Sequence, residues 1–257
     1  AASSSAAAEG APRVFGDEVS LRISDGVAVL TMIATEGEFP WGTKREEHRF
    51  SPALVEALSE ALDDVEGRPD VCALVLANEG KYWSNGMDLK FLDASEGAAV
   101  KEHSSRVNAL LTRLCCFPVP TIAALAGHWC ATGGMMGLAL DYRVMSSDRG
   151  FFFIPGVDLG LIYAPMQVEL MKAKLPLLMH REVILFNSKR WSAADLVDQG
   201  VVEAAVPAEE VAARAWELAA ALRAKGRGPA RSALGGIKRH VYRAVLQAQE
   251  DGHGMAY

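Results

Sequence analysis

Two glycine-containing loops hold the residues whose types and spacing are best suited to chemistry. They read KYWSNGMDL (residues 81–89) and AGHWCATGGMMG (residues 126–137). Glycine lets backbone N–H groups approach a ligand closely, so two such loops facing each other could donate two N–H groups to one oxygen. Such an oxyanion hole suits a carbonyl that becomes an enolate. The alternative is that Gly133 and Gly134 only allow a helix to pack closely on a strand.

A third segment, RGFFFIPGVDLGL (residues 149–161), places a carboxylate among apolar side chains. Asp158 there is either a general base with a shifted pKa or a loop residue that accepts hydrogen bonds from backbone N–H groups. Tyr163 follows two residues after this segment. Its hydroxyl could donate a hydrogen bond to a ligand, or its ring could simply pack in the core.

The first half of the chain predicts strands and helices that end at these loops. Residues 19–23 and 27–33 alternate around Asp25 and Gly26, which is typical of a hairpin. Residues 35–50 are polar and mixed in charge, and we expect a surface loop. Ser51 and Pro52 are typical of a helix start, and apolar spacing continues to about residue 66. Residues 71–77 are continuously apolar, as in a strand buried on both faces.

The second half shifts from strands to helices. We expect a helix at about 96–115, a buried strand within PVPTIAALAG (residues 118–127) and short strands at 142–145 and 151–153. Beyond Ala164 the pattern is helical, with a short capped helix from Ser192 and longer helices at 208–224 and 229–249. This order predicts one α/β domain with a C-terminal helical extension.

Composition excludes several classes of protein. The chain has 257 residues, is half hydrophobic and carries a net charge of −6. It is therefore long enough for a sizeable core and shows no basic footprint for nucleic acid or an anionic membrane. No apolar run reaches the roughly 18 residues that a membrane helix needs. The cysteines contain no CxxC pair, and we interpret them as reduced intracellular thiols that bind no metal: Cys72, Cys115, Cys116 and Cys130.

The two termini carry no recognisable targeting signal. Residues 1–13 are a low-complexity leader without the basic and apolar regions of a signal peptide. The last residues, DGHGMAY, differ from an SKL-type peroxisomal address.

Three stretches of the sequence resemble the crotonase, or enoyl-CoA hydratase/isomerase, superfamily. They are SNGMDLKFL (84–92), the pattern AG…GG…LALDYRVM (126–145) and FFFIPGVDLGL (151–161). The resemblance extends from about residue 19 to about residue 205 and is greatest to plant-type Δ3,Δ2-enoyl-CoA isomerases. It implies a spiral of ββα units at 14–206, followed by a helical oligomerisation region at 207–257 that assembles trimers or hexamers.

The resemblance also implies roles for individual residues. The first oxyanion N–H would come from Met87 and the second from Thr132, or from Gly133 if the alignment slips by one residue. The superfamily's two glutamates would fall at Met135 and at Gly156, so both acid/base positions are empty. Asp158 is the nearest remaining candidate base, and in an extended segment it would point to the same side as Gly156. We further expect substrate contacts at Lys81, Ser84, Gly86, Trp129, Met135, Gly156 and Tyr163.

The function that the resemblance implies is acyl-CoA processing. The leading hypothesis is a Δ3,Δ2-enoyl-CoA isomerase that needs no metal and no cofactor besides the coenzyme A of its substrate. One alternative is a lyase, hydrolase or decarboxylase that uses other residues. The other is a non-catalytic acyl-CoA binder or a partner of an active paralogue. The location implied is peroxisomal, by resemblance alone, with the cytoplasm as the alternative.

Overall fold

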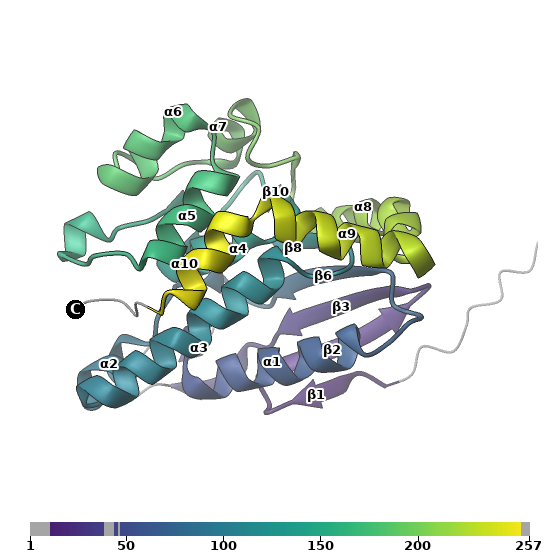
Figure 1. Cartoon of the computed structure of the whole chain (residues 1–257), viewed down its shortest axis with the longest axis horizontal. Helices are drawn as coiled ribbons and strands as arrows, with labels where there is room; N and C mark the ends of the chain where they lie inside the picture. The colour runs from purple at the N-terminus through teal and green to yellow at the C-terminus, as the bar shows by residue number, and fades with distance from the viewer. Residues whose placement is uncertain (1–10, 39–43, 46, 253–257) are drawn as a thin grey trace, which may run out of the picture.

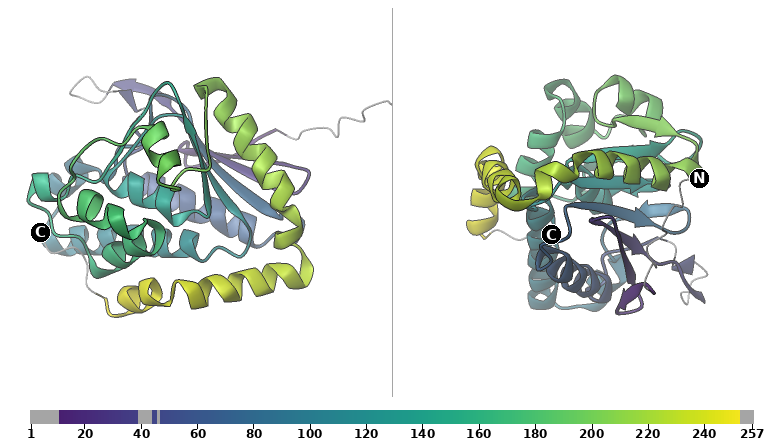
Figure 2. Two further views of the ribbon diagram at one scale, coloured as in Figure 1. Left: turned by 90° about the horizontal axis from the view of Figure 1, so that it is seen from above. Right: turned by 90° about the vertical axis from the view of Figure 1, so that its right-hand side faces the viewer.

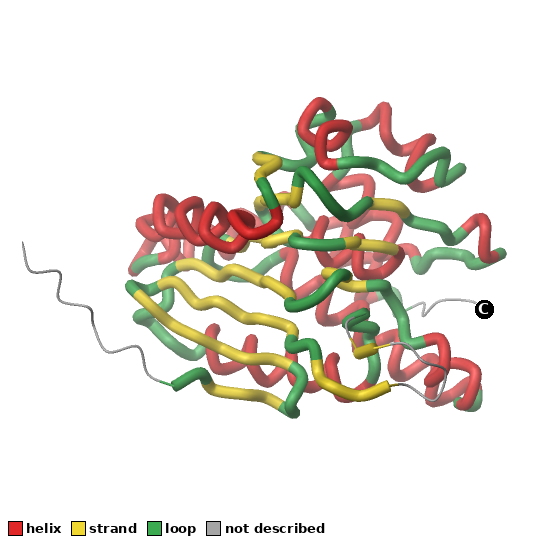
Figure 3. The backbone as a smooth tube through the Cα atoms, turned by 180° about the vertical axis from the view of Figure 1, so that it is seen from behind, coloured by secondary structure: helices red, strands yellow, loops and turns green. Residues whose placement is uncertain are grey.

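The computed structural model describes residues 11–38, 44, 45 and 47–252 (Figure 1). Among them, seven strands form the main sheet in the order β1-β2-β3-β6-β8-β10-β12. The first two pairs are antiparallel, and the pairs from β3 onward are parallel. The strands are β1 Arg13–Phe15, β2 Val19–Ser24, β3 Val27–Met32, β6 Ala73–Asn78, β8 Thr121–Leu125, β10 Tyr142–Ser146 and β12 Ala204–Val206. Figure 3 shows these strands side by side from behind.

A smaller parallel sheet has the order β11-β9-β7. Its strands are β7 Tyr82–Ser84, β9 His128–Cys130 and β11 Phe152–Phe153. The helices are α1 Pro52–Glu66, α2 Leu89–Ala94, α3 Gly97–Cys115, α4 Ala131–Ala139, α5 Pro165–Lys174, α6 Leu177–Met179, α7 Ala193–Asp198, α8 Val211–Leu222, α9 Gly228–Val241 and α10 Arg243–Glu250. Short helical turns are η1 Val157–Leu159, η2 His180–Leu185, η3 Ala208–Glu210 and η4 Arg223–Gly226.

The chain repeats one unit three times: a strand of the main sheet, a strand of the small sheet, and then one or two helices. The units are β6-β7-α2-α3, β8-β9-α4 and β10-β11-η1-α5. This repetition is the predicted spiral of ββα units, and the helices that follow confirm the predicted α/β class with a helical C-terminal part. Because parallel strands of one sheet end at the same edge, the repeat gathers the loops after β7, β9 and β11 at one place.

The central strands are buried on both faces, as their continuous apolar runs predict. In β6, Leu74 and Leu76 pack in the larger core with α1 and α3, whereas Ala73 and Val75 pack in a second core with α8. Figure 2 shows α8 crossing one face of the sheet while α9 and α10 lie on the other side of the molecule. The first helix of the predicted C-terminal region therefore packs directly on the main sheet.

The C-terminal helices are attached to the core through a buried lysine. The side chain of Lys238 in α9 is 5% exposed. Its Nζ donates to the carbonyl oxygens of Phe117 and Val119, at 2.9 and 3.0 Å, and to Asp141 Oδ2 at 2.6 Å. Asp141 also accepts from the backbone N–H and the hydroxyl of Thr121. The ammonium group thus has an acceptor for each of its three protons, which is what burial of such a charge requires.

Several sequence predictions are confirmed, and two are wrong. The hairpin is β2-β3, and Ser51 caps α1 by accepting a hydrogen bond from the N–H of Leu54. The predicted surface loop at 35–50 instead contains the strand pair β4 (Thr35–Glu38) and β5 (Lys44–Arg45) and continues into His48, which is 5% exposed. Residues 39–43, 46 and 253–257 lie outside the described residues, as do residues 1–10 of the leader predicted at 1–13. Arg13, the last residue of that leader, instead begins β1, which pairs with β2. Among the helices that the structure describes, none is long and apolar enough to span a membrane.

Candidate active site

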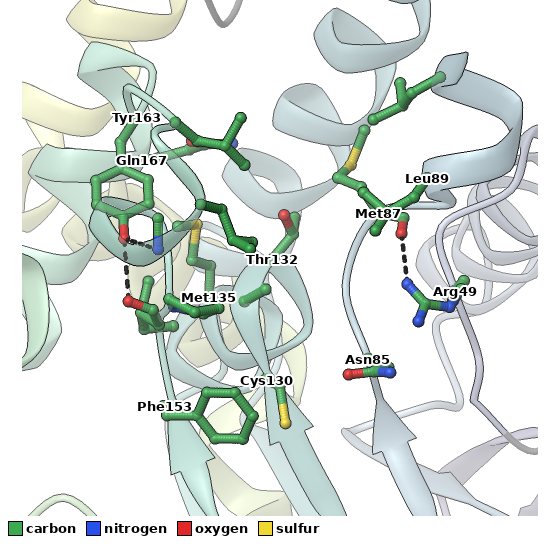
Figure 4. Close-up of a pocket in the computed structure, with 17 residues that line it drawn as sticks. Arg49, Asn85, Met87, Leu89, Cys130, Thr132, Met135, Phe153, Tyr163 and Gln167 are labelled. Carbon is green, nitrogen blue, oxygen red and sulfur yellow. Dashed lines mark hydrogen bonds between the residues drawn. The ribbon is translucent and has the colours of Figure 1, made fainter. Parts of the chain in front are cut away.

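A pocket of about 170 Å³ lies at the carboxyl ends of the three strands of the small sheet (Figure 4). Its floor is formed by residues at or just after those strand ends, and its walls come from α2, α4 and the segment between β11 and α5. The lining consists of Arg49, Asn85, Met87, Leu89, Leu92, Cys130, Ala131, Thr132, Met135, Phe153, Ile154, Pro155, Gly156, Leu159, Leu161, Tyr163 and Gln167. Most of these side chains are apolar, so the pocket suits an acyl chain better than a polar ligand.

Two backbone N–H groups are placed at this pocket by left-handed residues. Gly86, with φ 81°, directly precedes Met87, and Ala131, with φ 51°, directly precedes Thr132. A left-handed alanine costs on the order of 1–2 kcal/mol, and such strain is concentrated at functional sites. Thr132 is the second residue of α4, so its N–H has no acceptor within the helix and lies at the positive end of the helix dipole. The two loops meet here, because a Cβ on Gly86 would lie 3.2 Å from the nitrogen of Thr132.

The geometry favours Thr132 over Gly133 as the second donor. Thr132 lines the pocket, whereas Gly133 does not. A Cβ on Gly133 would lie 2.5 Å from the carbonyl oxygen of Ser84 in β7, so a larger residue there would force α4 away from the small sheet. Close packing of helix on strand, the alternative considered for the glycine pair, therefore accounts for Gly133.

The segment around Gly156 differs from the sequence prediction. We expected an extended backbone, but Gly156 has φ −56° and ψ −47°, and η1 follows as a helical turn. The turn is closed by the N–H of Leu161, which donates to the carbonyl of Gly156 at 2.8 Å. Residues two apart on a helical turn point to different sides, so Gly156 and Asp158 do not share a face.

Asp158 is consequently not brought into the pocket. Its side chain is exposed and accepts a hydrogen bond from Nδ2 of Asn187, and it is absent from the lining. The carboxylate therefore does not act as a base within the pocket, and the hydrogen bond found for it comes from a side-chain amide rather than from the backbone N–H groups that the alternative predicted.

Tyr163 occupies the space beside Gly156. The N–H of Gly156 donates to Tyr163 Oη at 2.7 Å, and the phenol donates to the carbonyl oxygen of Ile154 at 3.1 Å. A Cβ on Gly156 would lie 2.2 Å from both Cζ and Oη of the tyrosine. The phenol therefore fills the position from which a side chain at residue 156 would project. Met135, the other position where the superfamily would have a glutamate, lines the pocket from α4.

Four of the predicted substrate contacts, Lys81, Ser84, Gly86 and Trp129, lie outside the lining. Lys81 is exposed at the opposite end of β7. Ser84 is buried and donates to the carbonyl of His48 at 2.8 Å, and Trp129 is buried against Phe152 with ring centroids 4.3 Å apart. Trp129 therefore packs β9 against β11, and Ser84 joins β7 to the segment before α1. Gly86 contributes the left-handed backbone that precedes Met87.

Sequence reasoning missed Arg49, Asn85, Phe153 and Gln167 as lining residues. Arg49 donates from Nη1 to the carbonyl of Met87 at 3.2 Å and from Nε to Glu47 at 2.6 Å, so it holds the first donor loop. Its segment reads as a charged surface loop, and the one available signal is its position directly before Phe50 and the capped start of α1. Gln167 is 1% exposed and is bonded to Asn108 and to the N–H of Ala164.

The described lining holds no carboxylate and no histidine. Its titratable side chains are Arg49, Cys130 and Tyr163. Burial raises the pKa of Cys130 to about 12. Burial also raises the pKa of Tyr163 above its ordinary value, although the hydrogen bond from Gly156 acts in the opposite direction. Both side chains are therefore protonated and neutral at pH 7. Among the described residues, no three His, Cys, Asp or Glu side chains are grouped so as to hold a metal ion.

The fold, with its pocket at the ends of the small sheet, defines a crotonase-type α/β protein, a class whose members generally act on acyl-CoA thioesters. Residues 44–254 match the model of the enoyl-CoA hydratase/isomerase family, and the chain belongs to that family. The solved structure of a probable enoyl-CoA hydratase from Mycobacterium tuberculosis H37Rv superimposes with a TM-score of 0.79 at 26% identity, over 92% of this chain and 93% of that one.

Plant isomerases are among its relatives. Enoyl-CoA delta isomerase 3 of Arabidopsis thaliana is 32% identical over 167 residues, which are 63% of this chain and 70% of that protein. Enoyl-CoA delta isomerase 1, peroxisomal, of the same plant is 28% identical over 161 residues, which are 62% of this chain and 67% of that protein. The predicted resemblance to the superfamily and to its plant isomerases is thereby confirmed.

Proposed function

We propose that the protein binds acyl-CoA thioesters and holds the thioester carbonyl oxygen between the N–H groups of Met87 and Thr132. The observation that carries this proposal is the left-handed residue directly before each donor, at a pocket where the two loops meet. Two fixed donors, one of them in the first turn of a helix, stabilise the negative charge that develops on the oxygen of an enolate.

The acyl group would lie along the apolar side of the pocket. Leu89 and Leu92 of α2, Met135 of α4 and Leu161 all contribute to the lining. Removing such surfaces from water stabilises a bound chain by roughly 0.8 kcal/mol for each methylene that is buried. Affinity should therefore rise with acyl length until the pocket is filled.

The reaction that we propose for this site is the Δ3 to Δ2 shift of an enoyl-CoA double bond. The names of the plant relatives support it. The shift requires that a proton leave C2 and return at C4, and Tyr163 is the lining group placed to carry it. Because the phenol takes up a proton only as phenolate, isomerase turnover should be slow at pH 7 and rise with pH. No cofactor besides the coenzyme A of the substrate takes part.

Calorimetry with acyl-CoAs of increasing chain length tests the binding proposal, and failure of all of them to bind at millimolar concentration would refute it. Turnover of a panel of 3-enoyl-CoAs, compared with heat-inactivated protein, tests the reaction. Binding without turnover would instead support the non-catalytic alternative, which is favoured because the lining that the structure describes contains no carboxylate.

A homo-oligomer, trimeric or hexameric, is part of this proposal. Large apolar side chains are exposed together on α6 and η2, namely Leu177, Leu178 and Leu185, with Phe186 directly after them. Such a patch is typical of an interface between subunits. Sedimentation at micromolar concentration tests it, and a 27.6 kDa monomer would contradict it.

The location that we propose is the peroxisome, which is part of the printed name of one plant relative above. Imaging of a fluorescent fusion of the full-length protein in plant cells tests this, and a diffuse cytoplasmic signal would contradict it.

A further inference from the structure

The pocket is suited to stabilising an enolate, yet its described lining has no group that accepts a proton at neutral pH. Cys130 and Tyr163 are neutral acids there, and Arg49 is a cation already bonded to Glu47 and to the Met87 carbonyl. A general base normally contributes about 10²–10⁴-fold to a proton abstraction. Among the groups that the structure describes, an enolate that arises without a base is therefore the one that this lining suits best at neutral pH.

Cleavage of a carbon–carbon bond at C2 gives an enolate without a base. When a carboxylate on C2 leaves as CO2, the electron pair of the broken bond stays on C2 and is delocalised onto the thioester oxygen. Negative charge then moves from the carboxylate to an oxygen held by two N–H donors. The apolar side chains of Leu92, Met135 and Leu161 disfavour the negative charge of the starting carboxylate. They do not oppose the movement of that charge onto the thioester oxygen.

Tyr163 is placed to complete the reaction. Its oxygen is fixed by the N–H of Gly156, and its proton is shared with the carbonyl of Ile154 over a longer contact of 3.1 Å. Figure 4 shows the phenol on one side of the pocket and Arg49 on the other, with Thr132 and Met135 between them. A neutral donor therefore lies across the pocket from the charged side chain that holds the Met87 loop.

We propose that the protein decarboxylates 2-carboxyacyl-CoA thioesters of the malonyl type, and that the Tyr163 hydroxyl protonates the resulting enolate at C2. This inference rests on the proposed thioester site. The C2–carboxylate bond breaks, CO2 leaves, and the thioester enolate forms. A C–H bond then forms at C2 as the phenol O–H breaks, and the phenolate regains a proton from water. One proton is consumed for each CO2 released, and no oxidant or reductant is needed.

The experiment uses the full chain with malonyl-, methylmalonyl- and ethylmalonyl-CoA. CO2 release and the decarboxylated acyl-CoA are measured together, and in D2O the product should gain one deuterium at C2. Tyr163→Phe keeps the ring and removes the hydroxyl, so kcat/KM for product formation should fall by about 10²–10⁴-fold. Its Kd for a saturated acyl-CoA should stay within about twofold of wild type. Tyr142→Phe, at the start of β10 and outside the pocket, is the matched control.

The dependence of the rate on pH separates a proton donor from a base. Asp158 is the charged group that acts on the phenol, and with burial it favours the protonated form. Decarboxylation should therefore be constant from about pH 6 to 9 and decline only where a tyrosine ionises, near or above pH 10. A rate that rises with pH would instead identify the phenolate as a base and overturn the proposal.

The remaining outcomes are equally decisive. If saturated acyl-CoAs bind but none of the three carboxylated thioesters loses CO2, the inference is wrong and the thioester site stands. If no acyl-CoA binds, both fail. If Tyr163→Phe forms product as fast as wild type, the assignment of the proton donor is wrong.

Discussion

Adding a single methyl group at Gly156 tests the contact with Tyr163 most directly. The backbone of Gly156 is right-handed, so alanine meets no conformational strain there and would by itself stabilise the fold by about 0.4–1 kcal/mol. The new Cβ, however, would lie 2.2 Å from the ring and hydroxyl of Tyr163, well inside contact distance. The tyrosine must move and lose its hydrogen bonds to Gly156 and Ile154.

The expected magnitude follows from these opposing contributions. Overpacking costs about 1–3 kcal/mol, and each lost hydrogen bond costs about 0.5–1.5 kcal/mol. After the gain from alanine is subtracted, Gly156→Ala should lower the free energy of unfolding by about 3 kcal/mol, the middle of the range that these contributions span. For a chain of this size, that lowers Tm by about 6–12 °C.

The sign should reverse when Tyr163 is removed. In a Tyr163→Ala background the space is open, and Gly156→Ala should raise the free energy of unfolding by about 0.4–1 kcal/mol. A double-mutant cycle measured by urea unfolding should therefore give a coupling of about 4 kcal/mol, well above the 0.3–0.5 kcal/mol scatter of independent sites. If Gly156→Ala stabilises the wild-type background, the phenol does not occupy this space and the reasoning is wrong.

Four further predictions concern the site and its support. Thr132→Ala should change any enolate-forming turnover little, whereas Thr132→Pro, which removes the N–H, should lower kcat about 10²–10³-fold. Circular dichroism must show that the proline variant is folded. Equal losses in the two variants would mean that the threonine hydroxyl matters instead of the N–H. Asp158→Ala should leave kcat/KM within about twofold of wild type, because the carboxylate is exposed and outside the pocket; a loss above tenfold would contradict this. Lys238→Met should lower the free energy of unfolding by about 3–5 kcal/mol, because it leaves Asp141 and two carbonyls without the ammonium group that they bind. A change below 1 kcal/mol in urea unfolding would refute the stabilising role of this lysine. Burial lowers the pKa of Lys174 from 10.5 to about 8. Between these pH values the unfolded chain binds more protons than the folded one, so this group makes the free energy of unfolding rise with pH. Lys174→Met should remove that rise, and an unchanged dependence of the free energy of unfolding on pH would contradict the assignment.

Local patterns in the sequence were sufficient to predict the elements whose causes are local. Ser51 with Pro52 is a capping signal within one turn, and the alternation around Asp25 and Gly26 specifies a hairpin. Both are found in the structure. The repeat of ββα units was predicted from resemblance, because no periodicity in the letters reveals which strands share a sheet.

The contents of the pocket could be predicted only in part. Met87 and Thr132, which the resemblance proposes as donors, both line the pocket, because glycine-containing loops after apolar strands are a recognisable signal. Gly156 and Tyr163 were both noted, but their contact depends on a turn closed by Leu161, which no local pattern shows. Arg49 was missed because its role depends on a loop that lies nearly forty residues later in the chain.

The buried ammonium group of Lys238 also affects how the chain is made. During synthesis the strands and helices around Asp141 leave the ribosome about a hundred residues before α9 does. Until α9 is available, water must solvate Asp141 and the carbonyls of Phe117 and Val119. The turn between α3 and β8 and the end of α4 therefore cannot reach their final packing before α9 docks. The nascent protein should therefore pass through a species with a formed sheet and an open, wet seam along α3. Full protection of the Thr121 N–H, which donates to Asp141, from hydrogen exchange should appear only when α9 docks.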